Sequence, residues 1–327
     1  MNKIPIVFAF DDNYALPASI AIKSLLDSKK LDTNYEIIVF HGGLKQPTIK
    51  KMNSICDIRW IKVDSMSLKN VPVGWSGLET YYRLFMADLL PEYEKVIWSD
   101  VDVLFKGDLS DIFVNDISNF DWAGIPAEKQ NELNGIHTHF EENTKPFIYM
   151  PGFMIANLKL WREKNLLKKF FQIIEEYGDR LKMFDLDILN LAADNIKEIP
   201  FDYCVLENIY DNDDISNAKE APWLLNTYTK EELIRAKNNP IIIHYAGNDI
   251  KIWLRNANII PKYYWDYIIK SPFYNHEFYY PSRLKCVISI TLFYLVEITC
   301  PIKAWRKEIR QKRKLINKKL EKRGIYE

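Results

Sequence analysis

The first 63 residues alternate between apolar runs and amphipathic stretches, and this alternation leaves few folds open to the chain. The apolar run at residues 4–10 predicts a buried strand, and residues 35–40 and 58–63 predict two further strands. The segments 17–28 and 46–55 between them predict helices. This order of strands and helices predicts right-handed crossovers and a largely parallel sheet, and therefore an α/β fold. Ligands of such sheets bind beyond the carboxyl ends of the strands.

Two aspartates interrupt a later apolar stretch. Residues 96–98 form an apolar run that leads into Asp100 and Asp102, and residues 103–105 resume it. In an extended chain, residues i and i+2 face the same side, so we expect the two carboxylates to lie together. Neighbouring buried carboxylates are costly unless a cation bridges them, and a divalent metal is the simplest such cation.

The same Asp-x-Asp spacing occurs twice more, so spacing alone does not identify a metal site. Asp185 and Asp187 open a predicted helix, where acidic residues stabilise the N-terminus, and this explains them about as well as catalysis does. Asp211 and Asp213 lie in a polar stretch that is typical of a solvated loop. The apolar surroundings of Asp100 distinguish it from the other two pairs.

A short apolar run at residues 240–243 ends at His244. A single histidine after a strand is more often structural than a ligand. Gly247 and Lys251 follow it, however, and a glycine lets backbone amides approach a phosphate while a lysine supplies the matching charge. The chain has neither G-x-G-x-x-G nor G-x-x-x-x-G-K-[ST], which excludes a standard dinucleotide fold and a P-loop enzyme.

Taken together, six motifs resemble glycosyltransferase family 8, particularly the bacterial lipopolysaccharide galactosyltransferases and glucosyltransferases, over roughly residues 4–255. In chain order they are IVFAFDDNY (6–14), TYYRL (80–84), DVD (100–102), GFMIANLKLW (152–161), DLDILN (185–190) and HYAG (244–247). The resemblance implies a Rossmann-like GT-A fold and a retaining enzyme that transfers galactose or glucose from UDP-galactose or UDP-glucose. It also implies Mn²⁺ as cofactor, with Mg²⁺ as an alternative, and a glycan acceptor of lipopolysaccharide or other cell-surface polysaccharide synthesis.

The resemblance also implies roles for individual residues. The sugar nucleotide is assigned to Ala9, Asp11, Asn13 and Arg83, and the hydroxyls of its donor sugar to Asp185. The metal is assigned to Asp100, Asp102 and His244, and the diphosphate to Gly247 and Lys251. Asp185 and Asp187 are the candidate catalytic residues. A metal with carboxylate and imidazole ligands, together with a lysine, neutralises the charge that develops on a diphosphate leaving group.

Three positions depart from the family pattern. Leu186 replaces the glutamine of the common Asp-Gln-Asp, and leucine can neither act as a nucleophile nor stabilise a cation by hydrogen bonding. We therefore expect attack on the face from which UDP departs, with a phosphate oxygen accepting the proton, rather than Asp187 acting as a nucleophile. Met150 stands where relatives often have asparagine, so no sugar contact is assigned to it. The segment from Gly247 to Trp253 is one residue longer than usual, which affects the reach of Lys251.

The C-terminal end is strongly basic. Residues 303–327 carry eleven lysines and arginines against three glutamates, a net charge of +8, and an apolar run at 286–296 precedes them. Spanning a bilayer takes about 20 apolar residues, so this run predicts a helix lying in the interface of an anionic membrane. Tyr279, Tyr280 and Trp305 are candidate interfacial anchors. The alternative is a helix packed on the catalytic body; nucleic-acid binding is not expected, because few aromatic residues are interleaved among the basic ones.

We therefore expect a catalytic domain at residues 1–270 and a membrane-associating tail at 271–327. The first apolar run ends at Asp11 and Asp12, too soon for a signal peptide, and the four cysteines form no C-x-x-C pair. These features favour a cytoplasmic protein at the inner face of the membrane, with a lipid-linked oligosaccharide as acceptor.

Two other functions stay open at this point. One is a haloacid-dehalogenase-like phosphatase with Asp100 as nucleophile, which would need a downstream acidic pair that Asp213 and Asp214 match poorly. The other is a non-catalytic sugar-nucleotide-binding protein, which we would expect to have lost part of the metal-binding set.

Overall fold

The computed structural model describes residues 3–68, 71–72, 77–133, 135–246, 251–253, 260–276, 283–299, 301 and 303–321. The chain divides into two units: the first comprises residues 1–248 and 266–273, and the second comprises residues 249–265 and 274–327. The boundary that we expect at residue 270 stays a prediction.

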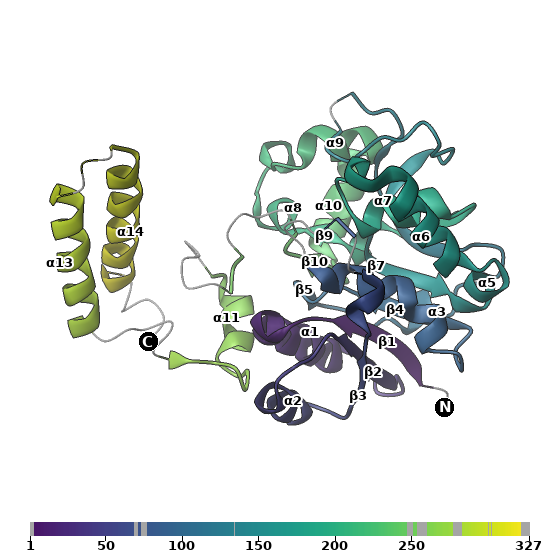
Figure 1. The fold of residues 1–327 in the computed structure, drawn as a ribbon, viewed down its shortest axis with the longest axis horizontal. Helices are drawn as coiled ribbons and strands as arrows, with labels where there is room; N and C mark the ends of the chain where they lie inside the picture. Colours follow the sequence, from purple (N-terminus) through teal and green to yellow (C-terminus); the bar gives the residue numbers. More distant parts are fainter. Residues whose placement is uncertain are drawn as a thin grey trace. The chain divides into compact units, whose positions relative to one another are not determined.

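A seven-stranded sheet organises the first unit (Figure 1). In spatial order its strands are β3 (Ile58–Lys62), β2 (Tyr35–His41), β1 (Ile4–Ala9), β4 (Lys95–Ser99), β7 (Phe147–Asn157), β6 (Trp122–Lys129) and β8 (Ile196–Glu198). Strands β3, β2, β1 and β4 are parallel to one another, as are β6 and β8, and only β7 among these seven runs antiparallel to its neighbours. The expected largely parallel sheet is confirmed.

Helices cover both faces of this sheet, as the alternation of side chains along its strands requires. In β1, Ile6 and Phe8 pack in a core shared with α1 (Ala15–Ser28) and α2 (Gln46–Asn53), while Val7 points to the opposite core. That second core is filled from α3 (Met86–Leu89), α5 (Leu158–Glu163), α6 (Leu166–Tyr177) and α7 (Asp185–Ala192), and Figure 1 shows the two groups of helices on opposite sides.

A three-stranded sheet adjoins the first. It consists of β5 (Val103–Phe105), β10 (Ile242–His244) and β9 (Val205–Leu206), with β10 antiparallel to β5 and parallel to β9. Further helices described in the unit are α4 (Ser110–Phe113), α8 (Glu207–Asp211), α9 (Ala221–Thr227) and α10 (Lys230–Asn238). Helix α11 (Lys262–Ile268) has residues in both units. The 3-10 turns of the first unit include η1 (Asp12–Tyr14), η4 (Gly178–Arg180), η5 (Phe201–Tyr203) and η6 (Ile215–Asn217).

One predicted helix has a different form. The pattern over residues 79–90 predicts an α-helix, but residues Leu78–Phe85 form a 3-10 helix, η3, before α3 begins at Met86. Tyr81, Tyr82, Arg83 and Leu84 are all buried, so this segment has no solvent-facing side over these four residues. Consecutive side chains of a 3-10 helix point in different directions, so all four are buried because other elements surround this segment, among them β1, β2, α6 and α7.

In the second unit, α13 (Arg283–Thr299) and α14 (Lys303–Glu321) form a helical hairpin (Figure 1). Glu297 accepts hydrogen bonds from Nε of Arg310 at 2.6 Å and Nε of Arg313 at 3.1 Å, which ties the two helices together. The predicted helix at 286–296 is therefore present and longer than expected. Among the helices described, none is both long and apolar enough to cross a bilayer. Tyr279 and Tyr280 lie outside the described residues.

Candidate metal and sugar-nucleotide site

The two aspartates that interrupt the apolar stretch lie where the chain passes from one sheet to the other. Strand β4 ends at Ser99 and β5 begins at Val103, so Asp100 and Asp102 occupy the connection. The backbone bends there and is not the extended strand that the sequence predicts. The carboxylates nevertheless converge, because the turn brings both to the same junction.

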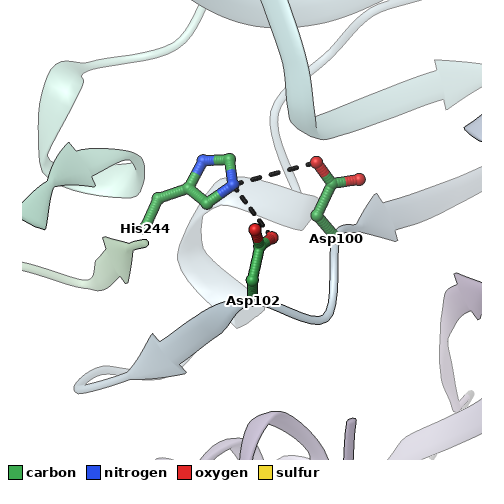
Figure 2. Close-up of side chains that lie close together, drawn as sticks. All are labelled: Asp100, Asp102 and His244. Carbon is green, nitrogen blue, oxygen red and sulfur yellow. Dashed lines mark hydrogen bonds and ion pairs between the residues drawn. The ribbon is translucent and has the colours of Figure 1, made fainter. Parts of the chain in front are cut away.

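Strand pairing brings His244 to this junction from a distant part of the sequence. His244 lies opposite Val103 in the antiparallel β5–β10 pair, and the backbone N–H of Tyr245 donates to the carbonyl of Asp102 at 2.9 Å. Nε2 of His244 lies 3.2 Å from Oδ1 of Asp102 and 3.8 Å from Oδ2 of Asp100 (Figure 2). One ligand atom from each of the three side chains lies within 4.8 Å of the others.

This set of donor atoms suits a divalent cation. Mn²⁺ readily binds two carboxylate oxygens together with one imidazole nitrogen. Mg²⁺ prefers oxygen ligands, so this set suits it less well. Burial lowers the pKa of His244, but the adjacent Cys204 and Asp102 raise it, and the balance lies well above the ordinary value. A cation bound at Nε2 would compete with this proton, so metal affinity should depend on pH.

Arg83 connects Asp100 of the junction to another acidic residue, Asp185. Its side chain is buried, and its guanidinium donates to Oδ1 of Asp100 at 2.7 Å and to the carbonyl of Pro151 at 2.7 Å, and lies 3.1 Å from Oδ2 of Asp185. The guanidinium also lies 4.6 Å from the ring centroid of Trp98, whose indole nitrogen donates to Asp100 at 3.2 Å. These contacts fix Arg83 between the candidate metal ligand and the candidate sugar contact.

The segment that carries Asp185 enters its helix through an unusual backbone conformation. Phe184 has φ 51° and ψ −116°, which costs about 1–3 kcal/mol for a bulky residue. Its ring packs edge-on against Tyr81 with the centroids 6.5 Å apart, and Thr80 donates to Asp185. Packing thus maintains the strained turn that directs Asp185 toward Arg83.

The two acidic residues of α7 differ in their surroundings. Burial raises the pKa of Asp185 and outweighs the opposing effects of Arg83 and Thr80. Asp187 is 1% exposed, and its Oδ2 accepts the backbone N–H of Met183 at 2.8 Å, at the start of its own helix. Burial raises the pKa of Asp187 to about 6. The catalytic roles implied for both residues stay predictions.

The other predicted contacts are distributed as follows. Ala9 ends β1 and Asp11 follows it, at the same edge of the sheet as Asp100, because β1 and β4 are parallel neighbours. Asp11 caps η1 by accepting the backbone N–H of Asn13 at 2.9 Å, and it also accepts from the side-chain amide of Asn13 at 2.6 Å. Lys251 belongs to the second unit, where its ammonium lies 5.8 Å from the ring centroid of Trp253.

Gly247 lies outside the described residues. The diphosphate contacts implied for Gly247 and Lys251 therefore stay predictions.

Three residues that shape the junction are not among the predicted site residues. A Cβ at Gly152 would lie 2.7 Å from Cε1 of His244 and 3.1 Å from Oδ2 of Asp100, so no side chain fits there. Thr80 and Trp98 hold Asp185 and Asp100, respectively. Thr80 and Gly152 lie inside motifs that carry the resemblance, and this was the available signal for them.

Comparison with known proteins identifies the family. The model of "Glycosyl transferase family 8" matches residues 5–257. The chain belongs to glycosyltransferase family 8. The resemblance drawn from the six motifs is confirmed, and membership in family 8 argues against the phosphatase alternative.

Individual family 8 relatives are distant. Lipopolysaccharide 1,2-glucosyltransferase of Escherichia coli is 24% identical over 251 residues, which cover 73% of this chain and 70% of that protein. General stress protein A of Bacillus subtilis is 25% identical over 295 residues, covering 86% of this chain and 93% of that protein. Among solved structures, galactosyltransferase LgtC in complex with donor and acceptor sugar analogs has a TM-score of 0.63 at 20% identity, over 81% of this chain and 100% of that chain. At this identity the likeness establishes the α/β GT-A type of fold.

Proposed function

We propose that this family 8 protein is a metal-dependent, retaining hexosyltransferase that uses UDP-galactose or UDP-glucose as donor. The observation that carries the proposal is the convergence of Asp100, Asp102 and His244 at the junction of the two sheets. Neighbouring carboxylates at this spacing are stable with a cation between them, and Mn²⁺ suits this mixed oxygen and nitrogen set. When bound, the metal would supply charge neutralisation for the departing diphosphate.

The residues of the chain itself would orient the donor. We propose that Asp11 and Asn13, beyond the end of β1, contact the uridine, and that Asp185, which lies beside Arg83, contacts the hydroxyls of the donor sugar. Arg83 cannot move independently of either carboxylate, because each bonds to a different nitrogen of the same guanidinium. We infer that Arg83 keeps the metal ligands and the sugar contact in a fixed relation, which lowers the cost of orienting the donor.

For the transfer itself we propose attack on the face from which UDP departs, with a phosphate oxygen of the donor accepting the acceptor's proton. Leu186 has no group that could act as a nucleophile. Asp187 is a poor candidate because its carboxylate is buried and bonded to the backbone of Met183. A nucleophile must reach the reacting carbon, and a side chain that is 1% exposed does not.

The direct test is UDP release from UDP-galactose and UDP-glucose, with Mn²⁺, with Mg²⁺ and with EDTA. The proposal predicts that one of the two donors releases UDP, that EDTA abolishes this release, and that added Mn²⁺ restores it. Tight binding of a UDP-sugar without release under any condition would instead support the non-catalytic alternative.

We further propose that the hairpin of α13 and α14 binds an anionic membrane surface, which would place the enzyme at the inner face of the cytoplasmic membrane beside a lipid-linked acceptor. Apolar side chains of α13 are exposed to solvent, among them Leu292, Leu295, Val296 and Ile298, and Trp305 of α14 is 60% exposed. The neighbouring helix α14 is rich in lysine and arginine, and each basic residue contributes about 1 kcal/mol near an anionic surface. Apolar and basic side chains together are typical of helices that lie in the membrane interface.

Sedimentation with vesicles tests this location. The full-length protein should pellet with vesicles that contain anionic phosphatidylglycerol and should pellet much less with pure phosphatidylcholine. Replacing Leu292 and Ile298 together by glutamate should reduce pelleting at least fivefold while UDP release stays unchanged. Equal pelleting of this variant and the wild type would reject the membrane role and favour a hairpin that packs on protein.

A further inference from the structure

A buried thiol contacts the candidate metal ligand His244 from the side opposite the two aspartates. Sγ of Cys204 lies 3.3 Å from Nδ1 of His244, whereas Asp102 lies 3.2 Å from Nε2. Figure 2 shows that the second ring nitrogen points away from both carboxylates. Cys204 is 1% exposed, and none of the roles that the family resemblance implies involves it.

The fold fixes this contact. Cys204 directly precedes β9, and β9 pairs in parallel with β10, so that Val205 lies beside Ile243 and Leu206 beside His244. The backbone N–H of Cys204 donates to the carbonyl of Phe201 at 2.9 Å, which fixes its position in the chain turn before the strand. Between the two nitrogens, the Cε1 atom of the imidazole faces Gly152, and it lies so close that a Cβ on residue 152 would not fit. The ring is therefore enclosed by Cys204, Gly152 and the two aspartates.

We propose that Cys204 is a positioning residue for His244: its sulfur accepts a hydrogen bond from Nδ1–H and thereby holds the ring with Nε2 directed at Asp100 and Asp102. This inference rests on the proposed metal site. An imidazole that binds a metal through Nε2 carries its proton on Nδ1, and that N–H usually donates to a carboxylate, a backbone carbonyl or a water. Here the acceptor is a sulfur, which is weaker.

A competing explanation is that Cys204 only fills space, because a buried cysteine behaves as a small apolar side chain. The two explanations predict different metal affinities and different stabilities for two substitutions of Cys204. If Cys204 positions the ring, Cys204→Ser should preserve metal affinity, since a hydroxyl also accepts, and Cys204→Ala should lose it. If Cys204 only packs, neither change should alter metal affinity, and the serine variant should be the less stable because it buries a hydroxyl.

The experiment measures Mn²⁺ binding to the full-length protein by electron paramagnetic resonance, with no donor present, and urea unfolding in EDTA. We expect Cys204→Ala to weaken Mn²⁺ binding about tenfold, the lower end of what such partners contribute. Cys204→Ser should stay within about threefold of the wild type, and Cys56→Ala, a half-buried cysteine, serves as the matched control. Wild-type affinity in Cys204→Ala would overturn the inference.

Two further measurements keep the inference testable. If Cys204→Ala does not fold, ¹⁵N-histidine NMR of the metal-free wild type, at a pH at which the His244 ring is neutral, should show its proton on Nδ1, and a proton on Nε2 would overturn the inference. His244→Ala separates this inference from the proposed function. If His244→Ala binds Mn²⁺ as the wild type does, the metal site itself is wrong; if it loses binding while Cys204→Ala keeps it, only the role of Cys204 is wrong.

Discussion

Gly152→Ala should damage the metal site although residue 152 offers no ligand. The added Cβ would lie 2.7 Å from Cε1 of His244, 3.1 Å from Oδ2 of Asp100 and 3.2 Å from Nδ1 of His244. Real Cβ atoms essentially never approach closer than 3.0 Å, so the imidazole or strand β7 must move by a few tenths of an ångström. The strand cannot move alone, because the carbonyl of Gly152 accepts the backbone N–H of Asp100 at 2.7 Å. Either movement displaces a candidate ligand.

Overpacking of this kind costs roughly 1–3 kcal/mol. If that energy is released by moving His244 away from the two aspartates, Mn²⁺ affinity should fall about tenfold, since 1.4 kcal/mol corresponds to a factor of ten. The assay is electron paramagnetic resonance titration of free Mn²⁺, with urea unfolding measured in EDTA. Gly107→Ala is the matched control, because its Cβ would meet Cδ1 of Ile241 at the same 2.7 Å but at the flexible end of a side chain. Equal Mn²⁺ affinity in the two variants would refute the reasoning.

Three further predictions follow from the same network. Arg83→Met leaves Asp100 and Asp185 without the cation that they share, and it should lower the free energy of unfolding by about 3 kcal/mol, as measured in urea at pH 7.5. A loss below about 1 kcal/mol, or an equal loss in Arg83→Lys, would contradict this. Because the pKa of Asp187 is about 6 in the folded state and 3.8 ordinarily, the folded protein binds this proton more tightly than the unfolded chain, so this group adds stability as the pH falls from above 6 to 4. Asp187→Asn should therefore be more stable than the wild type at pH 8, by up to roughly 3 kcal/mol, and lose that advantage near pH 4; a difference that does not change with pH would rule out an ionised Asp187 as its cause. Leu186→Ala should keep the rate of sugar transfer within about tenfold, and a fall of several orders of magnitude would show that residue 186 takes part in the chemistry.

The sequence predicts the βαβαβ half of the sheet well because β1 and β2 are buried on both faces and the helices between the strands repeat apolar side chains at helical spacing, although the edge strand β3 is only partly buried. Periodicity carries less information elsewhere. Residues 81–84 are buried in every direction, so the pattern over 79–90 does not distinguish a 3-10 helix from an α-helix. The antiparallel direction of β7 depends on how the chain returns after β6, which an apolar run by itself does not encode.

The candidate site was predicted only in part for a related reason. Asp100 and Asp102 are recognisable because charges are unusual between apolar runs, whereas His244 has only weak local support from Gly247 and Lys251 and is assigned to the metal through the family resemblance. Its proximity to them results from the pairing of β5 with β10, which joins segments about 140 residues apart. Cys204 has no local signal at all, since its contact with His244 depends on the pairing of β9 with β10.

The most direct test of the metal site is Mn²⁺ binding to the wild type, Asp102→Asn and His244→Ala, measured by electron paramagnetic resonance between pH 6 and 8. We predict one Mn²⁺ per chain, bound more tightly as the pH rises because the proton on His244 is removed. Each substitution should weaken binding at least tenfold, and His244→Ala should also remove most of the pH dependence. Wild-type Mn²⁺ affinity in both variants would contradict the assignment of Asp100, Asp102 and His244 as the metal site.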